Sequence, residues 1–300
     1  MTEHKDNPIL GMAAGAAAFF LFAVMMVFAK ILSETHHVIE IAFYRNLIAT
    51  LPFLFIIFVM GKRDILVIQK KPVAVGMRSL LGTLSLVLTF AAFAAMPMAD
   101  TTAFLFTSSL FIPVLGLFFL HEKVGPYRWG AVLTGFTGVL IMATPAGEIN
   151  TLGVTLALSA AFMHAILQTL LRHLGKFEKP ETVTFYFVLI GTITSALALP
   201  FVASPPTVEE IPLLFGVGLT GALAQYLISV AFSKAPAAII TVFNYSGIIW
   251  ATLFGWVIWQ DLPSLSIWIG GSIVIVSNLF IIWRESRQGK ITEDRIRAKI

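Results

Sequence analysis

The sequence contains no cysteine, so it can form neither a disulfide framework nor a thiolate metal site. Charge is also scarce, because Asp, Glu, Lys and Arg make up 12% of the 300 residues, whereas hydrophobic residues make up 58%. The mean hydropathy of +0.89 and the long apolar runs leave too little polar surface for a soluble globule of this length. The composition therefore predicts an integral membrane protein.

Signatures of enzymes are missing as well. There is no Walker A lysine loop and no nucleophile elbow, and His121-Glu122 has no second histidine four residues on. The segment Gly216–Gly221 fits the dinucleotide pattern, but it lies in an apolar stretch without a preceding strand, where small residues favour close helix packing. We therefore expect no enzymatic activity, no cofactor and no metal, and a carrier driven by gradients.

Two other classes stay open as alternatives. A membrane-embedded enzyme acting on a lipid-linked substrate would need a cluster of acids or histidines at an interface, and none is evident in the sequence. A scaffold or receptor subunit would not require polar residues at mid-membrane depth in both halves of the chain.

The basic residues are distributed over alternate connections. With a net charge of +4 and a pI near 9.4, the chain could be taken for a nucleic-acid binder, but its Lys and Arg are scattered over short loops. Every second connection lacks Lys and Arg altogether: 33–38, 95–100, 144–150, 202–210 and 260–264. By the positive-inside rule, both termini are predicted to be cytoplasmic.

Ten apolar segments are long enough to cross a bilayer. We expect the spans at 9–32, 39–60, 73–94, 98–120, 127–144, 151–173, 182–201, 211–233, 237–259 and 265–284. The first is too long for the hydrophobic region of a signal peptide, so we count it as a span. Pro113 removes a helical hydrogen bond and is predicted to bend the fourth span.

The chain contains an internal repeat. A first constant shift places Phe43–Thr50 on Phe185–Thr192, where most positions are identical, and also Lys30 on Arg172. From Leu80 onward a second, slightly shorter shift aligns pairs such as Gly82 with Gly221 and Pro97 with Pro236. Because each copy holds five spans, the second copy must be inverted in the membrane, as in carriers that work by alternating access.

Several spaced features resemble the EamA-domain members of the drug/metabolite transporter superfamily. They are Lys30, Phe43-Tyr44-Arg45, Met96-Pro97, Leu120–Lys123, Trp129-Gly130, Ala235-Pro236, Tyr245 and Asp261–Pro263. The resemblance implies an all-α integral membrane protein with ten transmembrane helices in two inverted five-helix repeats, 9–144 and 150–284, followed by a cytoplasmic tail, 285–300.

The same resemblance implies a function. It is that of a secondary active transporter in a bacterial inner membrane, which moves a small organic metabolite, such as an amino acid, through a central cavity. An uptake carrier for an S-adenosylmethionine-like or riboflavin-like compound is the alternative, and Arg78 with the segment Phe43-Tyr44-Arg45 resembles the former type most. The expected partners are a small-molecule substrate and the lipid bilayer, with no nucleic acid. Coupling to a proton or a counter-solute, and a monomer or a homodimer, stay open.

Polar and aromatic residues near the middle of the spans are the candidates for binding the solute. An amide or imidazole in hydrocarbon must find polar partners inside the bundle, and aromatic rings can line a cavity. The predicted substrate-binding residues are His164, Gln168, Gln225, Tyr226, Asn244, Tyr245, Thr107, Trp250, Phe19 and Tyr44. The alternative for each is ordinary helix-to-helix packing.

Arg45 lies about 10 Å inside the second span at 1.5 Å per residue, and the second copy carries Phe187 in its place. A guanidinium there calls for a partner, and we expect Glu34, Glu40 or Asp100 to provide a carboxylate. With Lys30 and Glu40, Arg45 forms a predicted gating or charge-pair group. The alternatives for Arg45 are a structural ion pair, a snorkelling anchor, or a group that binds a carboxylate of the solute.

Overall fold

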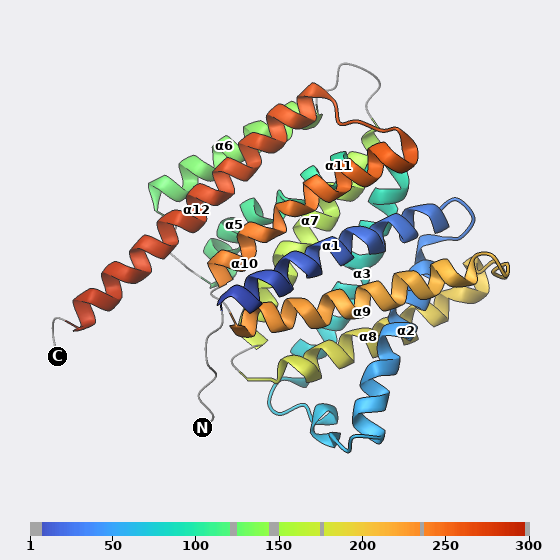
Figure 1. Ribbon diagram of the computed structural model, residues 1–300. Coiled ribbons are helices and arrows are strands. Elements are labelled where there is room, and N and C mark those ends of the chain that lie inside the picture. The colour runs from blue at the N-terminus through green and yellow to red at the C-terminus, as the bar shows by residue number, and fades with distance from the viewer. Residues whose placement is uncertain (1–7, 121–124, 144–149, 175–176, 235–236, 298–300) are drawn as a thin grey trace.

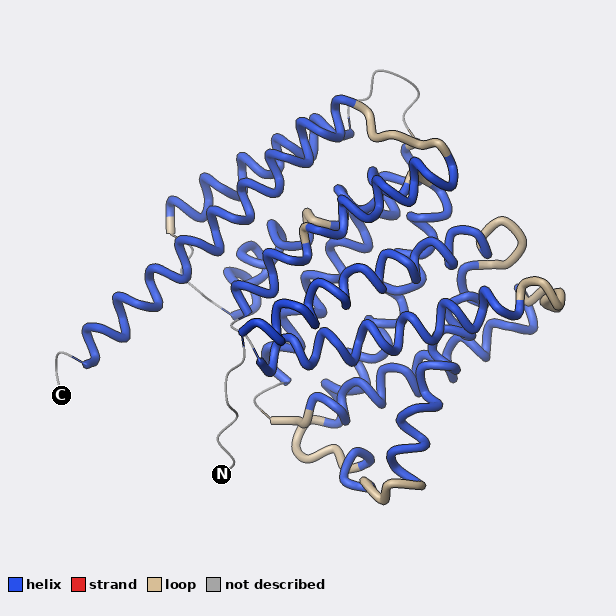
Figure 2. Tube along the Cα trace, viewed as in Figure 1, coloured by secondary structure: helices blue, strands red, loops and turns tan. Residues whose placement is uncertain are grey.

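The computed structural model describes residues 8–120, 125–143, 150–174, 177–234 and 237–297. Within these ranges every regular element is a helix and no strand occurs (Figure 2). Nine described segments are long and apolar enough to cross a membrane, and a tenth, Trp129–Ala143, is shorter but also apolar. This confirms the prediction of an all-α membrane protein with ten spans.

The helix bounds follow the predicted spans closely. The helices are α1 (Pro8–Leu32), α2 (Val38–Phe58), α3 (Pro72–Ala95), α4 (Met98–Leu105), α5 (Ser108–Leu120), α6 (Pro126–Ala143), α7 (Thr151–Leu174), α8 (Pro180–Val202), α9 (Ile211–Lys234), α10 (Ala237–Asn244), α11 (Ser246–Trp259) and α12 (Leu265–Arg297), with a 3-10 turn η1 (Arg63–Leu66) before α3. Helix α12 continues beyond the predicted end of its span at 284, to Arg297.

Helices from the two halves of the chain pack against each other in pairs (Figure 1). In this way α1 lies along α9, and α3 lies along α7; α2 packs on α8, and α6 packs on α12 at one edge of the molecule. Two further pairs, α2 with α9 and α3 with α8, place α9, α2, α8 and α3 in a row of neighbouring helices. The two halves are thus interleaved rather than separate.

Two of the spans are broken near their middle. The fourth is interrupted at Phe106-Thr107, between α4 and α5, and the ninth at Tyr245, between α10 and α11. Phe106 and Tyr245 are counterparts under the second shift of the repeat. The fourth span is therefore interrupted before Pro113 and not at the proline, which lies inside α5.

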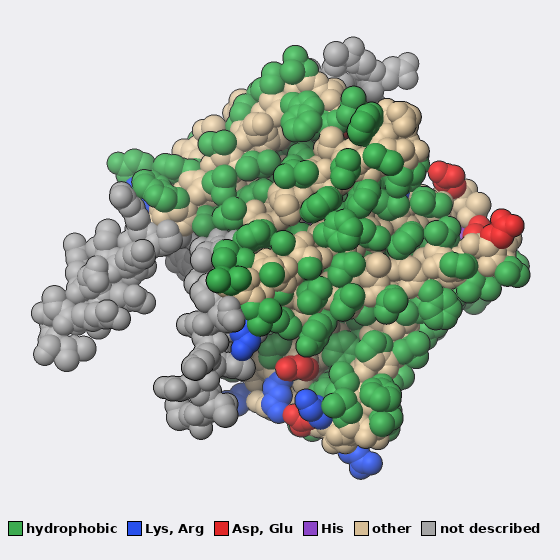
Figure 3. All heavy atoms as spheres, in the orientation of Figure 1, with side chains coloured by type: hydrophobic (Ala, Val, Ile, Leu, Met, Phe, Trp, Pro, Cys, Tyr) green, Lys and Arg blue, Asp and Glu red, His purple; other side chains and the backbone are tan. Residues whose placement is uncertain are grey.

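The surface follows from this packing. Figure 3 shows hydrophobic side chains over most of one face, with acidic side chains at the right edge and basic ones, mixed with acidic ones, towards the bottom. Large exposed apolar residues include Phe55, Leu140, Leu197 and Phe215. An apolar belt between charged ends is what a bilayer requires.

Candidate transport site

The two helix breaks meet inside the bundle. The rings of Phe106 and Tyr245 stack edge to face with centroids 5.1 Å apart. Asn278 of α12, which is 1% exposed, donates from Nδ2 to the carbonyl oxygen of Phe106 at 3.2 Å, and the Tyr245 hydroxyl interacts with Ser109 and Asn278. Non-helical backbone at membrane depth is tolerated where protein or a polar cavity satisfies it. Asn278 does so at the first break.

Two arginines are buried among α2, α3 and α8. Arg45 and Arg78 are 3% and 7% exposed, and their guanidinium carbons lie 5.6 and 4.3 Å from the centroid of the Phe187 ring. Arg45 Nη1 donates to Asn46 Oδ1 at 2.9 Å. Each cation–π contact contributes about 0.5–2 kcal/mol, whereas burying an unpaired ion costs several kcal/mol. The ring therefore offsets only part of the cost of these charges.

The two copies of the repeat carry different side chains at the position of Arg45. Phe187 is the counterpart of Arg45 under the first shift, and the two side chains are in contact. A Cβ added to Gly82 would lie 2.8 Å from the Phe187 ring, and one added to its counterpart Gly221 would lie 3.1 Å from Arg45 Nε. A glycine on the facing helix thus makes room for each of them.

The predicted ion pairs of Arg45 are not found. Among the described residues no carboxylate pairs with Arg45, and Glu40 pairs instead with His36. Glu34 is exposed, and Asp100 lies near Lys30 rather than Arg45. The prediction was wrong because Arg45 points towards α8 and α9, whereas Glu40 points into the loop between those two helices.

Lys30 closes one end of the bundle. Its ammonium donates to the carbonyl oxygens of Phe93 and Met96 at 2.8 and 2.6 Å, and lies 5.4 Å from the ring centroid of Trp259. A cation at the carboxyl end of α3 is favoured by the helix dipole and satisfies carbonyls that lack helical partners. Lys30 therefore joins α1, α3 and α11 at the end of the bundle where α1 finishes.

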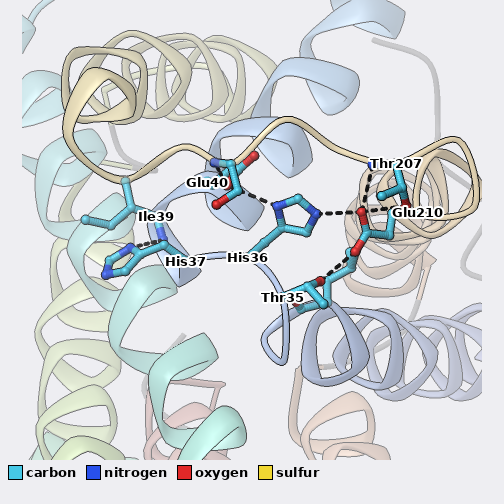
Figure 4. Close-up of polar contacts among 9 residues, drawn as sticks. Thr35, His36, His37, Ile39, Glu40, Thr207 and Glu210 are labelled. Carbon is cyan, nitrogen blue, oxygen red and sulfur yellow. Dashed lines mark hydrogen bonds and ion pairs between the residues drawn. The ribbon is translucent and has the colours of Figure 1, made fainter.

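At the same end, the loop before α2 is fastened to the loop before α9 (Figure 4). His36, 5% exposed, lies between two carboxylates, with Nδ1 3.1 Å from Glu40 Oε2 and Nε2 3.1 Å from Glu210 Oε2. Only the protonated imidazole carries a proton on both nitrogens, so the cation can pair with both carboxylates at once. We call this group, His36, Glu40 and Glu210, the His36 latch.

Glu210 is the most strongly held carboxylate of the His36 latch. Thr35 Oγ1 donates to Glu210 Oε1 at 2.7 Å, and the backbone N–H and hydroxyl of Thr207 both donate to Oε2 at 2.8 Å. These hydrogen bonds, with a further contribution from His36, lower the pKa of Glu210 to about 2. Glu40 receives the backbone N–H of Ser204 at 3.1 Å. Both carboxylates thus tie the two loops together.

A second fastening lies at the opposite end of α2. Glu178 accepts backbone N–H groups from Gln69, Lys70 and Lys71 at 2.6–2.8 Å, which joins the loop before α8 to the loop before α3. Burial acts to raise the pKa of Glu178, but the three donors outweigh it and the pKa lies below its usual value. Nearby, Lys179 forms an ion pair with Asp64 at 2.8 Å. We call Glu178 and its three backbone donors the Glu178 latch.

The predicted substrate-binding residues are not gathered in one place. Thr107 and Tyr245 belong to the two breaks, and His164 Nε2 lies 3.4 Å from Thr89 Oγ1, joining α7 to α3. Trp250 stacks on Phe20 at 5.0 Å. Phe19 and Tyr44 are half-buried and pack in separate apolar clusters.

The remaining polar candidates are on the surface or half-buried. Gln168, Asn244 and Tyr226 are exposed, the last by 66%, and Gln225 is half-buried. A depression of about 400 Å³ lies elsewhere, between α6 and α12, and is lined by residues such as Tyr127 and Ser277. Neither these four residues nor the depression provides the enclosed polar surroundings that the helix breaks have.

Sequence reasoning missed several residues that the structure brings forward. Asn278 lies within a predicted span, so its amide was a usable signal. His36 lies in the predicted connection 33–38 and Glu178 in the connection between the spans 151–173 and 182–201, and neither was among the predicted site residues. Arg78 was noted only for a resemblance, although a second arginine inside a span called for the same attention as Arg45.

The comparisons with known proteins find transporters. Residues 9–144 and 151–283 each match the EamA-like transporter family. The chain is 31% identical to a riboflavin transporter from Rhizobium johnstonii over 212 residues, 70% of either protein. It is 28% identical to a pseudopaline exporter from Pseudomonas aeruginosa over 89% of this chain and 94% of the exporter.

Two further likenesses extend over most of the chain. An S-adenosylmethionine uptake transporter from Rickettsia bellii is 26% identical, and the match covers 87% of this chain and 89% of the transporter. One crystal structure shares the fold, with a TM-score of 0.63 and 18% identity over 93% of this chain and 98% of the other. The relatives named here are transporters of different solutes, and the pseudopaline carrier works in the direction opposite to the uptake carrier.

Proposed function

Because the chain belongs to the EamA-like transporter family, we propose that it is a secondary active carrier that works by alternating access in a bacterial inner membrane. Membrane transport of a small metabolite, and the absence of an enzymatic role, follow from the family and the relatives. We propose an amino acid or a related compound as the solute. The observation that carries the mechanism is the contact between Phe106 and Tyr245 at two helix breaks one repeat apart.

The helix pairs support an inverted repeat of residues 9–144 and 150–284. If the first five spans exchange with the second five, the pair α1–α9 becomes α7–α3, and α2–α9 becomes α8–α3. The pairs α2–α8 and α6–α12 become themselves. Two copies related by a pseudo-two-fold axis in the membrane plane are expected to pack in this way.

The solute site is proposed at the helix breaks. Carriers of this architecture place their sites near mid-membrane, where interrupted helices offer backbone groups to the solute. Thr107, Tyr245 and Asn278 supply a hydroxyl, a phenol and an amide there. The Asn278 Oδ1 atom is buried, and apart from the interaction of this amide with the Tyr245 hydroxyl no donor reaches it among the described residues, so it can accept from an amino group.

The two latches support two access states. The His36 latch and the Glu178 latch lie at opposite ends of α2 and join loops of different repeats. Release of one while the other holds would open the bundle at one end only. The energy source is proposed to be a proton or counter-solute gradient, since the chain contains no nucleotide-binding loop.

The test is flux into liposomes. Purified protein is reconstituted and offered amino acids, S-adenosylmethionine and riboflavin, with and without a pH gradient or internal counter-solute. We expect counterflow of an amino-acid-type solute that protein-free liposomes lack, and a loss of flux in Tyr245→Ala. Flux of riboflavin or S-adenosylmethionine alone would favour the uptake-carrier alternative, and no flux of any solute by folded protein would contradict the proposal.

Orientation has its own test. A reporter fused after Gly147 is expected to read periplasmic, and one fused after Lys176 cytoplasmic, because only the latter connection is basic. The same location for both would contradict the inverted repeat, whatever the flux experiment gives.

A further inference from the structure

Several buried hydrogen-bond donors around Arg45 and Arg78 have no acceptor in the described part of the chain. Arg45 Nε, Arg78 Nε, Arg78 Nη1 and Asn46 Nδ2 are all buried, and none has a hydrogen-bond partner among the described residues. Within that part of the chain, the one acceptor that the structure assigns to either guanidinium is Asn46 Oδ1. Buried donors of this kind normally have partners, and buried charges are normally paired.

The charges are close enough to act on one another. Both guanidinium groups lie against the same Phe187 ring, and Arg45 contributes electrostatically to the environment of Arg78. Two like charges in low dielectric repel, so each increases the need for a negative group near the other. The ring provides weak compensation to both and neutralises neither.

The fold itself does not require these charges. The repeat counterpart of Arg45 is Phe187 under the first shift, and the second shift, carried back two residues from Leu80, places Arg78 on Val217; both counterparts are apolar. The second copy thus builds the corresponding helix contacts without arginine. Two buried guanidinium groups confined to the first copy indicate a role in binding.

We propose that Arg45 and Arg78 form a binding site for one carboxylate group, and that this carboxylate belongs to the transported solute. Planar guanidinium groups match the two oxygens of a carboxylate, and Asn46 Nδ2 adds a neutral donor beside them. The Phe187 ring, which packs on both arginines, is the group that must move as the anion enters. The assignment to the solute rests on the proposed carrier function; the carboxylate site does not.

Binding is tested on purified protein in detergent, without transport. The midpoint of thermal unfolding is followed as sodium acetate is added, against sodium chloride and sodium phosphate at equal ionic strength and against acetamide, which has the same shape without the charge. We expect acetate to raise the midpoint of the wild type in a saturable way and the other three to leave it unchanged. A rise with chloride or phosphate equal to that with acetate, or no rise with acetate, would overturn the proposal.

Variants locate the effect. Arg45→Phe places in the first copy the side chain that the second copy already holds at that position, so it is expected to fold while weakening acetate binding at least tenfold. Arg78→Gln is the second variant, and Arg63→Gln, an exposed arginine in η1, is the matched control. Undiminished acetate binding in both Arg45→Phe and Arg78→Gln would overturn the site. If both lose acetate binding while flux of the solute is unchanged, the site binds a carboxylate but not that of the solute.

Discussion

His36 and Glu178 occupy counterpart positions of the repeat, and each fastens its own loop to the loop before a neighbouring helix. Their chemistry differs. His36 is an imidazole that lies between two carboxylates, whereas Glu178 is a carboxylate held by three backbone N–H groups. One end of the bundle is therefore closed by contacts between side chains, and the other by hydrogen bonds from backbone to side chain.

His36→Ala is expected to loosen the loop before α9. Without the imidazole, none of the described side chains bridges Glu40 and Glu210, so the segment 203–210 should exchange its amide hydrogens faster. Hydrogen exchange read by mass spectrometry measures this. The control is His37→Ala, because His37 is exposed and, within the described residues, its ring accepts a hydrogen bond from the nearby backbone N–H of Ile39 and none from another helix. Equal acceleration in both variants would contradict the latch.

The contribution of Glu210 to stability is expected to depend on acidic pH. Its folded pKa is lowered to about 2 by Thr35, Thr207 and His36, from an ordinary value near 4.5. A lowered folded pKa means that the stabilisation is complete above the ordinary value and is lost as the pH falls towards the folded pKa. The difference in unfolding midpoint between wild type and Glu210→Gln should shrink between pH 4.5 and pH 2. A constant difference over that window would show that ionisation of Glu210 is not responsible.

Asn278→Ala is expected to destabilise the protein by about 1 kcal/mol, because interhelical hydrogen bonds in membranes contribute about 0.6–2 kcal/mol. The substitution removes the buried donor to the carbonyl oxygen of Phe106 at the first helix break. The free energy of unfolding in detergent is the measurement. Asn244→Ala, at an exposed position, is the control and should change it little.

The sequence could predict how deep in the membrane a residue lies, but not the direction in which its side chain points. Each span start was located closely, because apolar length sets where a helix crosses the bilayer. Counting along a span places Gln168 or Tyr226 at a depth, but whether the side chain points into the bundle depends on the helix packed beside it. Both proved exposed. The partner of Arg45 was mispredicted for the same reason, because Phe187 comes from a helix that is far away in the sequence but packs against α2.

The break in the fourth span shows a second limit. Proline marks a lost hydrogen bond, so Pro113 was the local signal for a bend. The actual interruption, at Phe106-Thr107, contains no proline or glycine and is held by Asn278 from α12 and by contact with Tyr245 from the other repeat. Tertiary contacts of this kind leave no trace in the local sequence.

Gly270→Ala is expected to destabilise the α6–α12 pair by roughly 1–3 kcal/mol. A Cβ there would meet the carbonyl oxygen of Gly138, and one on Gly138 would lie 2.6 Å from the carbonyl oxygen of Gly270, so backbone must shift in either variant. Gly76→Ala in α3 is the control, since nothing lies within 4 Å of its added Cβ. That variant should be neutral or stabilising, because alanine favours helix. The free energy of unfolding of the three variants separates steric from helix-propensity effects.

Alanine variants of His164 and Gln168 are expected to differ: the first should affect stability, and the second should affect transport. They lie one turn apart on α7, but His164 has a partner in Thr89 of α3, whereas Gln168 is exposed and no hydrogen bond of its side chain is seen among the described residues. His164→Ala should therefore lower the free energy of unfolding by about 0.6–1.7 kcal/mol, the range for such contacts in membranes. Gln168→Ala should leave it unchanged and reduce flux, because an exposed amide is available to the solute. Unchanged flux in Gln168→Ala, at equal amounts of folded protein in the liposomes, would assign Gln168 to the lipid-facing or solvent-facing surface and remove it from the transport path.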